Sequence, residues 1–442
     1  MDRLAPTRAR TFAGPAADAS TATGRRYRAT MFLAVATCVL VPAYTIRWHL
    51  GPLPTTILEN AILLTFAAFV LESIRESARP IWQTRVTVPA LVFLIAGAIS
   101  VFVAPDHRAA AGLYRAYFVE PIGFGLVLVN AVTTPRRALL IAVGLALGSV
   151  VAGLANSAVV VNALLHHAYD VVQTPPVVIY NTANAVALYL VPLVAFAGAV
   201  MLHWPGRIER TVAGAFVAVG VVCVLLSFSR GGYLALAAVA IGLALSHRVR
   251  WLLLGAGVVA AAGLLIVPVL RRRIETEINF SDPHNTLVGR SHLWDAALQM
   301  LRDHPIFGAG LSGFATAIAP YWNATHPDRF TYPHNIVLNF WTETGLLGVV
   351  AFAAILGATF ARAWRGWRNS DVYWRTVHLG VLLALLAVVV HGLVDVPYFK
   401  NDLSLEFWAL LSLTFAVGAG SLSSAHAAAA TQTSSPSKTA AP

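Results

Sequence analysis

The stretch TVAGAFVAVGVVCVLLSFSRGGYLALAAVAIGLALS, residues 211–246, decides how this chain folds. It consists of two apolar runs, and its only charged residue is Arg230, in the SRGG sequence at 229–232. Each run approaches the roughly 20 apolar residues that a helix needs to cross a bilayer. Inside lipid the backbone polar groups must bond within their own segment, which favours a helix. The stretch therefore predicts two transmembrane helices joined by a turn.

The rest of the chain repeats this pattern. Of its 442 residues, 57% are hydrophobic and only 12% are charged, whereas a soluble protein carries about 25% charged residues. The short alternating segments of a membrane β-barrel do not occur, so we expect an all-α, polytopic membrane protein. We predict about twelve transmembrane helices, at residues 30–46, 53–73, 86–104, 115–133, 138–160, 181–203, 211–228, 231–246, 251–270, 334–361, 376–396 and 403–421.

The basic residues set the expected orientation. The net charge of +11 would suggest a nucleic-acid-binding surface in a soluble protein. Here most arginines fall in alternate gaps between apolar runs, as do Arg136, Arg137, Arg207 and Arg210. Cytoplasmic loops of membrane proteins are enriched in basic residues. We therefore expect both termini in the cytoplasm and residues 271–333 as one large periplasmic loop.

Composition changes at both ends of the chain. Residues 1–28 are rich in Ala, Thr and Arg, and residues 423–442 in Ala, Ser and Thr, which is typical of disordered tails. We expect these cytoplasmic tails to flank one transmembrane domain at 29–422. Its two cysteines, Cys38 and Cys223, lie inside apolar runs and lack the spacing of a disulfide framework or a zinc site.

Arg230 stands at the break between two predicted helices, on the expected outer side. Gly231 and Gly232 permit a tight turn and a close approach of the backbone to a ligand. A guanidinium at this level, next to Ser229 and to exposed backbone N–H groups, suits a diphosphate at the lipid headgroups. The alternative is an arginine that snorkels from a helix end without binding anything.

The outer loop contains a predicted helix at 290–302, where apolar residues recur at helical spacing. His304 and Pro305 would end it. Arg290, at its start, could close over an anion from above, or could be an ordinary solvated arginine. The segment that follows can bend sharply because it contains three glycines, Gly308, Gly310 and Gly313.

A polar face begins where the outer loop enters the tenth predicted helix. His334 can accept a proton near neutral pH and so can act as a general base. Asn335, Asn339 and Glu343 follow at spacings of four and share one face of an otherwise apolar helix. That face should look into the bundle, either to bind substrate or to lock helices together.

Two further charged residues, Arg115 and Glu120, lie at the outer end of the fourth predicted span, and Glu59 lies near the outer side of the second. They could pair with each other or with Arg230 and Arg290. We regard Arg115 as a candidate substrate contact and Glu59 as a structural ion-pair partner. No Asp-x-Asp motif, Walker loop or metal-ligand spacing occurs, so no metal or cofactor is expected.

Several short motifs follow one another between about residues 210 and 355. They are SRGG at 229–232, Arg290 with Trp294, HP at 304–305, FGAG at 307–310, PHN at 333–335 and ETGLLG at 343–348. In this order and spacing they resemble the core of the O-antigen ligase and O-antigen polymerase superfamily. Weaker similarity lies around Arg115 and at 181–185.

The resemblance implies an inverting, metal-independent glycosyltransferase on the periplasmic face of the bacterial inner membrane. Its donor would be a glycan on undecaprenyl diphosphate, and its acceptor a hydroxyl of lipid A–core. Arg230 and Arg290 would bind the diphosphate and stabilise its growing charge. His334 would take the proton of the acceptor hydroxyl or help to hold the diphosphate. Substrate contacts are expected from four residues, Arg115, Ser229, Asn335 and Glu343.

Other acceptors remain open within the same family. A polymerase would extend the glycan on its lipid carrier, and a further variant would transfer it to a protein hydroxyl. A transporter belongs to another class. It would carry ionisable residues near the membrane midplane and an internal repeat, whereas here these residues cluster at the outer ends of the predicted helices and no repeat is evident.

Overall fold

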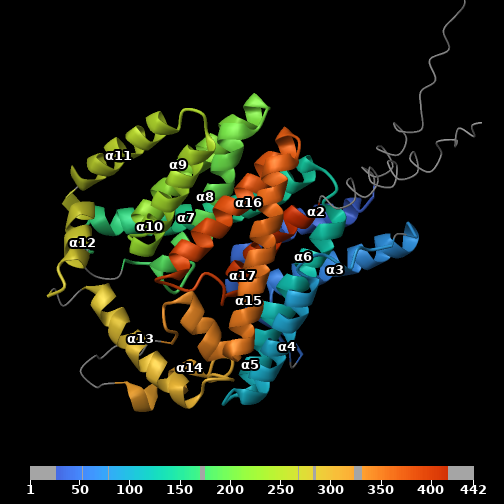
Figure 1. Cartoon of the computed structure of the whole chain (residues 1–442), viewed down its shortest axis with the longest axis horizontal. Helices are drawn as coiled ribbons and strands as arrows, with labels where there is room; N and C mark the ends of the chain where they lie inside the picture. The colour runs from blue at the N-terminus through green and yellow to red at the C-terminus, as the bar shows by residue number, and fades with distance from the viewer. Residues whose placement is uncertain are drawn as a thin grey trace, which may run out of the picture.

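Helices make up most of the chain (Figure 1). The computed structural model describes residues 26–51, 53–77, 79–169, 175–266, 268–281, 285–322 and 331–416. The first half contains α2 (Arg28–Val39), η1 (Val41–Thr45), β1 (Arg47–Leu50), β2 (Leu53–Thr56), α3 (Ile57–Arg75), α4 (Thr87–Val103), α5 (His107–Tyr114), η2 (Arg115–Val119), α6 (Glu120–Ala131), α7 (Pro135–Leu165) and α8 (Ala183–His203). The second half contains α9 (Arg207–Leu226), α10 (Arg230–Ser246), α11 (Arg250–Ile266), α12 (Pro268–Ile278), α13 (Thr286–Asp303), α14 (Phe314–Ala317), η3 (Ala319–Tyr321), α15 (Ile336–Asn369), α16 (Val372–Gly392) and α17 (Asn401–Phe415).

Each of the predicted spans overlaps a helix, so the expectation of a helical membrane protein is confirmed. Among the described residues, seven helices are long and apolar enough to cross a membrane: Ile57–Arg75, His107–Ala131, Pro135–Leu165, Ala183–His203, Arg207–Leu226, Ile336–Asn369 and Val372–Gly392. The others, such as α2, α4 and α10, are apolar but shorter. The count of twelve spans therefore stays a prediction.

The first predicted span was too long, and the chain is not purely helical. Helix α2 ends at Val39, and a 3-10 turn and an antiparallel hairpin of β1 and β2 precede α3. Pro42 explains the early end, because proline lacks an N–H donor and disfavours helical geometry in the residue before it. Helix α3 then begins at a capping box, in which Thr56 and Glu59 each satisfy the other's backbone N–H.

The ninth predicted span, 251–270, covers parts of two helices of the structure. Helix α11 runs to Ile266 and α12 starts at Pro268, while residue 267 between them lies outside the described residues. Helix α12 carries the expected outer loop's first arginines and glutamates, including the ion pair of Arg271 with Glu275.

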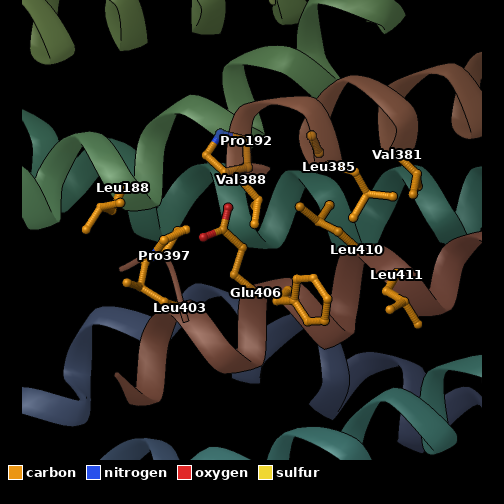
Figure 2. A pocket seen from close by; sticks show the side chains of 12 residues that line it. Leu188, Pro192, Val381, Leu385, Val388, Pro397, Leu403, Glu406, Leu410 and Leu411 are labelled. Atoms are coloured by element: carbon orange, nitrogen blue, oxygen red, sulfur yellow. The ribbon is translucent and has the colours of Figure 1, made fainter. Parts of the chain in front are cut away.

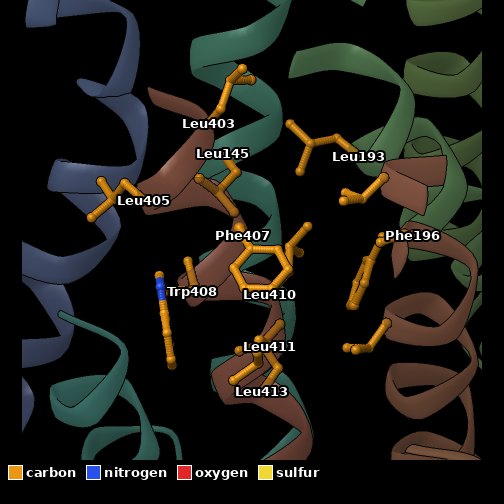
Figure 3. Packing of buried hydrophobic residues seen from close by; sticks show 14 of the residues in the cluster. Leu145, Leu193, Phe196, Leu403, Leu405, Phe407, Trp408, Leu410, Leu411 and Leu413 are labelled. Atoms are coloured by element: carbon orange, nitrogen blue, oxygen red, sulfur yellow. The ribbon is translucent and has the colours of Figure 1, made fainter. Parts of the chain in front are cut away.

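The interior of the bundle is filled by α8, α16 and α17. Figure 3 shows Leu193 and Phe196 of α8 facing Phe407 and Leu410 of α17, and Leu145 of α7 packs in the same layer. By contrast, large apolar side chains of the outer helices are exposed, among them Phe102, Ile208 and Ile266. A soluble monomer rarely exposes so much apolar surface. Such an apolar surface is stable in contact with lipid tails.

A small cavity lies in this interior, between α8, α16 and α17 (Figure 2). Figure 2 shows the carboxyl group of Glu406 inside it, near Pro192 and Val388. The free space is about 10 Å³, which is at the lower limit for a single water molecule. This cavity is too small to hold a substrate.

The expected outer loop folds against one end of the bundle, where α13 and α14 gather (Figure 1). The predicted helix at 290–302 is present as α13, and His304 caps its end. Gly308 and Gly310 adopt positive φ angles of 66° and 78°, which confirms the sharp bend. The tails predicted as disordered fall largely outside the described residues, which start at 26 and end at 416.

Candidate active site

The SRGG sequence forms the junction between α9 and α10, as its apolar flanks predict. Phe228 makes the turn with a φ of 51°, and Ser229 caps α10 by accepting a hydrogen bond from the Gly232 N–H at 3.2 Å. Arg230 is therefore the first residue of α10, and its side chain is half-buried. Ser229 is fully buried, so its role in this structure is to start the helix.

The two glycines of the junction lie inside the first turn of α10, and they are needed for packing. A Cβ atom on Gly231 would lie 2.8 Å from Cδ2 of His391 and 2.9 Å from a methyl group of Val394. A Cβ atom on Gly232 would lie 2.7 Å from that of Ala187. Because neither glycine has a side chain, the start of α10 can lie directly against α16 and α8.

Arg230 and Arg290 come together through α13. The Nη1 atom of Arg230 donates a hydrogen bond to the Thr286 hydroxyl at 2.7 Å. Thr286 is the first residue of α13, and Arg290 follows one helical turn later. Arg230 is thus hydrogen-bonded at the N-terminal end of α13, which carries a partial positive charge, and Arg290 belongs to the next turn of the same helix. Such a cluster suits an anion with several oxygens.

Trp294 joins α13 to the segment that carries His334. It lies one turn after Arg290, and its Nε1 atom donates to the Pro333 carbonyl at 2.9 Å. This contact gives a physical reason for the spacing of Arg290 and Trp294, since residues four apart share one helix face. It keeps the arginine near the histidine.

His334 lies directly before α15, with an unusual φ of 47°. Its Nδ1 atom is 3.3 Å from Oδ1 of Asp395, and its ring packs on Tyr332 with the centroids 4.3 Å apart. Asp395, in the segment between α16 and α17, is 1% exposed. Its oxygens also accept hydrogen bonds from the Asn184 side chain and the Val396 N–H. The histidine is thus held by a carboxylate that is itself fixed.

Electrostatics link this pair to Arg290. Burial alone would raise the pKa of Asp395, but the hydrogen bond and charge of His334, with His391 and Arg290, hold that pKa well below its usual value. The pKa of Tyr332 is raised by burial and by Asp395, while Arg290 opposes the shift. Asp395 is therefore an anion within the field of Arg290.

Asn335 and Glu343 have structural partners. The side chain of Asn335 caps α15 by accepting the N–H groups of Val337 and Leu338, and it donates to the Leu393 carbonyl at 3.1 Å. Glu343 is buried and accepts the N–H of Ser312, in the glycine-rich part of the outer loop. Both residues shape the site by holding its walls, and their expected contact with substrate stays a prediction.

Arg115 belongs to a separate charged cluster. Its Nη2 atom lies 2.9 Å from Glu59, and its Nε atom lies 3.2 Å from Glu120. Both carboxylates are buried, so the arginine's charge is balanced within the fold. Arg115, Glu59 and Glu120 therefore pair with each other, which is one of the two pairings that the sequence left open. A contact of Arg115 with substrate stays a prediction.

Sequence reasoning missed the carboxylate that supports His334. Asp395 and His391 lie four residues apart, at the end of the apolar run that forms α16. Ionisable residues at such a boundary are expensive and often functional, and this signal could have identified both. Their contacts with His334 and Gly231 join segments far apart in the chain, which no local pattern reveals.

A helical bundle with an apolar surface, in which the described residues include seven helices able to span a bilayer, indicates a multi-pass membrane protein. Residues 214–353 match the family model described as O-antigen ligase. This match assigns that part of the chain to the O-antigen ligase superfamily and confirms the resemblance drawn from its motifs. A comparison with curated proteins finds no match. The match supports, at a coarse level, an enzyme of the ligase or polymerase type, a family whose substrates are in general lipid-linked glycans.

Proposed function

We propose that the protein transfers a glycan from undecaprenyl diphosphate to a hydroxyl group of lipid A–core at the periplasmic face of the inner membrane. The observation that carries this proposal is the contact of His334 with Asp395 at 3.3 Å, and Arg290 contributes to the lowered pKa of that carboxylate. A histidine supported by a carboxylate is suited to take a proton, and a nearby arginine cluster is suited to a diphosphate.

In the proposed reaction the acceptor oxygen attacks the anomeric carbon of the glycan. A new C–O bond forms on one face while the bond to the diphosphate breaks on the other, so the configuration inverts. The bonding electron pair leaves with the diphosphate, and the hydroxyl proton moves to Nε2 of His334. Asp395 lies at Nδ1, where it favours the tautomer that carries its proton on Nδ1 and not on Nε2, and it stabilises the imidazolium that forms.

Arg230 and Arg290 act on the leaving group. The negative charge on the diphosphate oxygens grows as the bond breaks, and two preplaced cations stabilise that growth without reorganising. The hydrogen bond from Arg230 to Thr286 and the hydrogen bond from Trp294 to the Pro333 carbonyl both connect α13 to the proposed site and support this role. Loss of either arginine should therefore slow the chemical step more than it weakens acceptor binding.

The test uses purified full-length protein, an undecaprenyl-diphosphate-linked glycan and lipid A–core, with EDTA present. We expect transfer in wild type and a loss of at least about 100-fold in Arg230→Ala, Arg290→Ala and His334→Ala. Arg302→Ala, an exposed arginine of α13, is the control and should retain activity. Longer glycans on the carrier without transfer to lipid A–core would replace the ligase proposal with a polymerase.

A further inference from the structure

A second cavity opens close to His334. It has a volume of about 170 Å³, and its walls come from α5, η2, α8, α15 and the segments before α14, α15 and α17. Tyr332 is one of its lining residues, and the same ring packs against His334. A residue of the cavity wall is therefore in contact with the proposed base.

Asn339 is the most informative residue of this cavity. It lines the cavity, is 1% exposed, and no donor among the described residues reaches its Oδ1 atom. A buried polar atom without a partner costs about 1–3 kcal/mol, and native structures contain few. Oδ1 can only accept a hydrogen bond. A ligand with O–H or N–H donors would satisfy it.

Two charged residues, Glu343 and Lys400, also line the cavity. Glu343 accepts the N–H of Ser312 on one wall. Lys400, half-buried at the start of α17, contributes an ammonium group that can only donate. Acceptor and donor groups thus face the same space, which matches hydroxyl groups because each can donate and accept.

Aromatic rings complete the lining. Tyr117 and Phe399 lie edge to face with centroids 6.1 Å apart, and both border the cavity. Flat apolar rings beside a few directed polar groups are the usual walls of a small-molecule site. The volume is below the roughly 300 Å³ at which pockets for drug-sized ligands begin, so the space suits one ring and not a chain of rings.

We propose that this cavity binds one sugar ring of the acceptor and presents its hydroxyl to His334, with Asn339 as a specificity-determining residue. The proposal rests on the proposed function for the reaction it serves. The donor diphosphate belongs with Arg230 and Arg290, and neither arginine is among the lining residues of this cavity, so we assign the cavity to the acceptor. The ring can come from lipid A–core or from a growing glycan.

Direct binding provides the first test. Delipidated core oligosaccharide, and separately the glycan repeat released from its carrier, are titrated into detergent-solubilised wild type and Asn339→Leu. We expect at least one of them to bind wild type, with affinity reduced about tenfold or more in Asn339→Leu. Binding of neither sugar to folded wild type overturns the proposal, whether or not glycan transfer occurs.

Two further variants separate a local effect from a general loss of structure. Thr359→Val alters another buried polar residue of α15, whose hydroxyl bonds to its own helix and which does not line the cavity, and it should bind like wild type. Phe399→Leu removes an aromatic wall and should weaken binding on its own. Asn339→Leu should unfold at the same temperature as wild type or higher, because it removes an unsatisfied polar atom.

Kinetics distinguish the cavity from the donor site. In Asn339→Leu the KM for lipid A–core should rise about tenfold while the KM for the donor stays within about twofold. A rise in donor KM with unchanged acceptor KM would overturn the assignment to the acceptor. If the wild type binds core oligosaccharide but transfers no glycan, the sugar-binding site stands and the proposed function is ruled out.

Discussion

At the scale of single residues, the site depends on the backbone around His334. Few residues other than glycine adopt positive φ angles, and His334 does so directly before the N-cap of α15. Such conformations persist where the surroundings enforce them. Here Trp294 and Asn335 hold the segment on both sides of the histidine. The ring is thereby directed at Asp395 before any substrate arrives.

The role of Asp395 can be tested by Asp395→Asn. Both oxygens of Asp395 face donors, namely Asn184, the Val396 N–H and His334, so an amide NH₂ group has no suitable position. We expect kcat to fall on the order of 10³-fold, with little change in the KM for the donor, as measured in the transfer assay.

The matched control for this variant is Asp106→Asn. Asp106 caps α5 by accepting two backbone N–H groups, and asparagine caps a helix equally well. Activity should therefore be unchanged. If Asp395→Asn were as active as the control, His334 would not need its carboxylate, and the alternative in which the histidine binds the diphosphate would be favoured.

At the scale of elements, close helix packing positions the arginines. The start of α10 reaches α16 because Gly231 leaves room for His391. A second glycine, Gly345, allows α15 to kink, with a φ of 68° and a ψ of −176°. Its Cα lies so near the outer-loop backbone that a side chain would meet the Ile306 carbonyl. Both glycines fix how the outer segments join the bundle.

Gly231→Ala should destabilise the protein by about 1–3 kcal/mol, because the added methyl group overlaps the buried ring of His391. It should also reduce glycan transfer, since α10 carries Arg230. Gly255→Ala on α11 is the matched control, because nothing lies within 4 Å of its Cβ position. Alanine is favoured over glycine in a helix, so this control should unfold at an equal or higher temperature. Equal melting temperatures of the two variants would contradict the packing argument.

At the scale of the whole molecule, the charge bias predicts which side of the membrane each end of the bundle faces. Arg302 lies on α13, in the expected periplasmic loop, and Arg368 lies at the end of α15 that the charge pattern assigns to the cytoplasm. Both residues are exposed. The two native cysteines, Cys38 and Cys223, are buried, so they should react slowly.

Labelling of intact spheroplasts with a membrane-impermeant maleimide tests this orientation. Arg302→Cys should react from outside, and Arg368→Cys should react only after the membrane is permeabilised. Wild type provides the background from the buried thiols. Reaction of Arg368→Cys in intact spheroplasts would invert the topology and move the candidate active site to the cytoplasmic face.

The sequence by itself determined the helical membrane architecture and several of the candidate site residues. Long apolar runs dictate helices wherever the solvent is lipid, because backbone groups there have no other partners. For the same reason a polar interruption of an apolar run, such as residues 229–232, is easy to detect. Arg230 could therefore be recognised as a candidate site residue from its neighbours in the sequence alone. A deviation arose at Pro42, where proline ends a helix earlier than the apolar pattern does.

Only the tertiary structure decided how these residues act together. The contact of His334 with Asp395, the pairing of Arg115 with Glu59 and the cavity next to Asn339 all join segments that are far apart in the chain. The hydrophobic pattern of a segment depends only on the sequence of that segment. Contacts between segments depend on the rotation and depth at which the helices pack, and these are set by side-chain fit across the whole bundle.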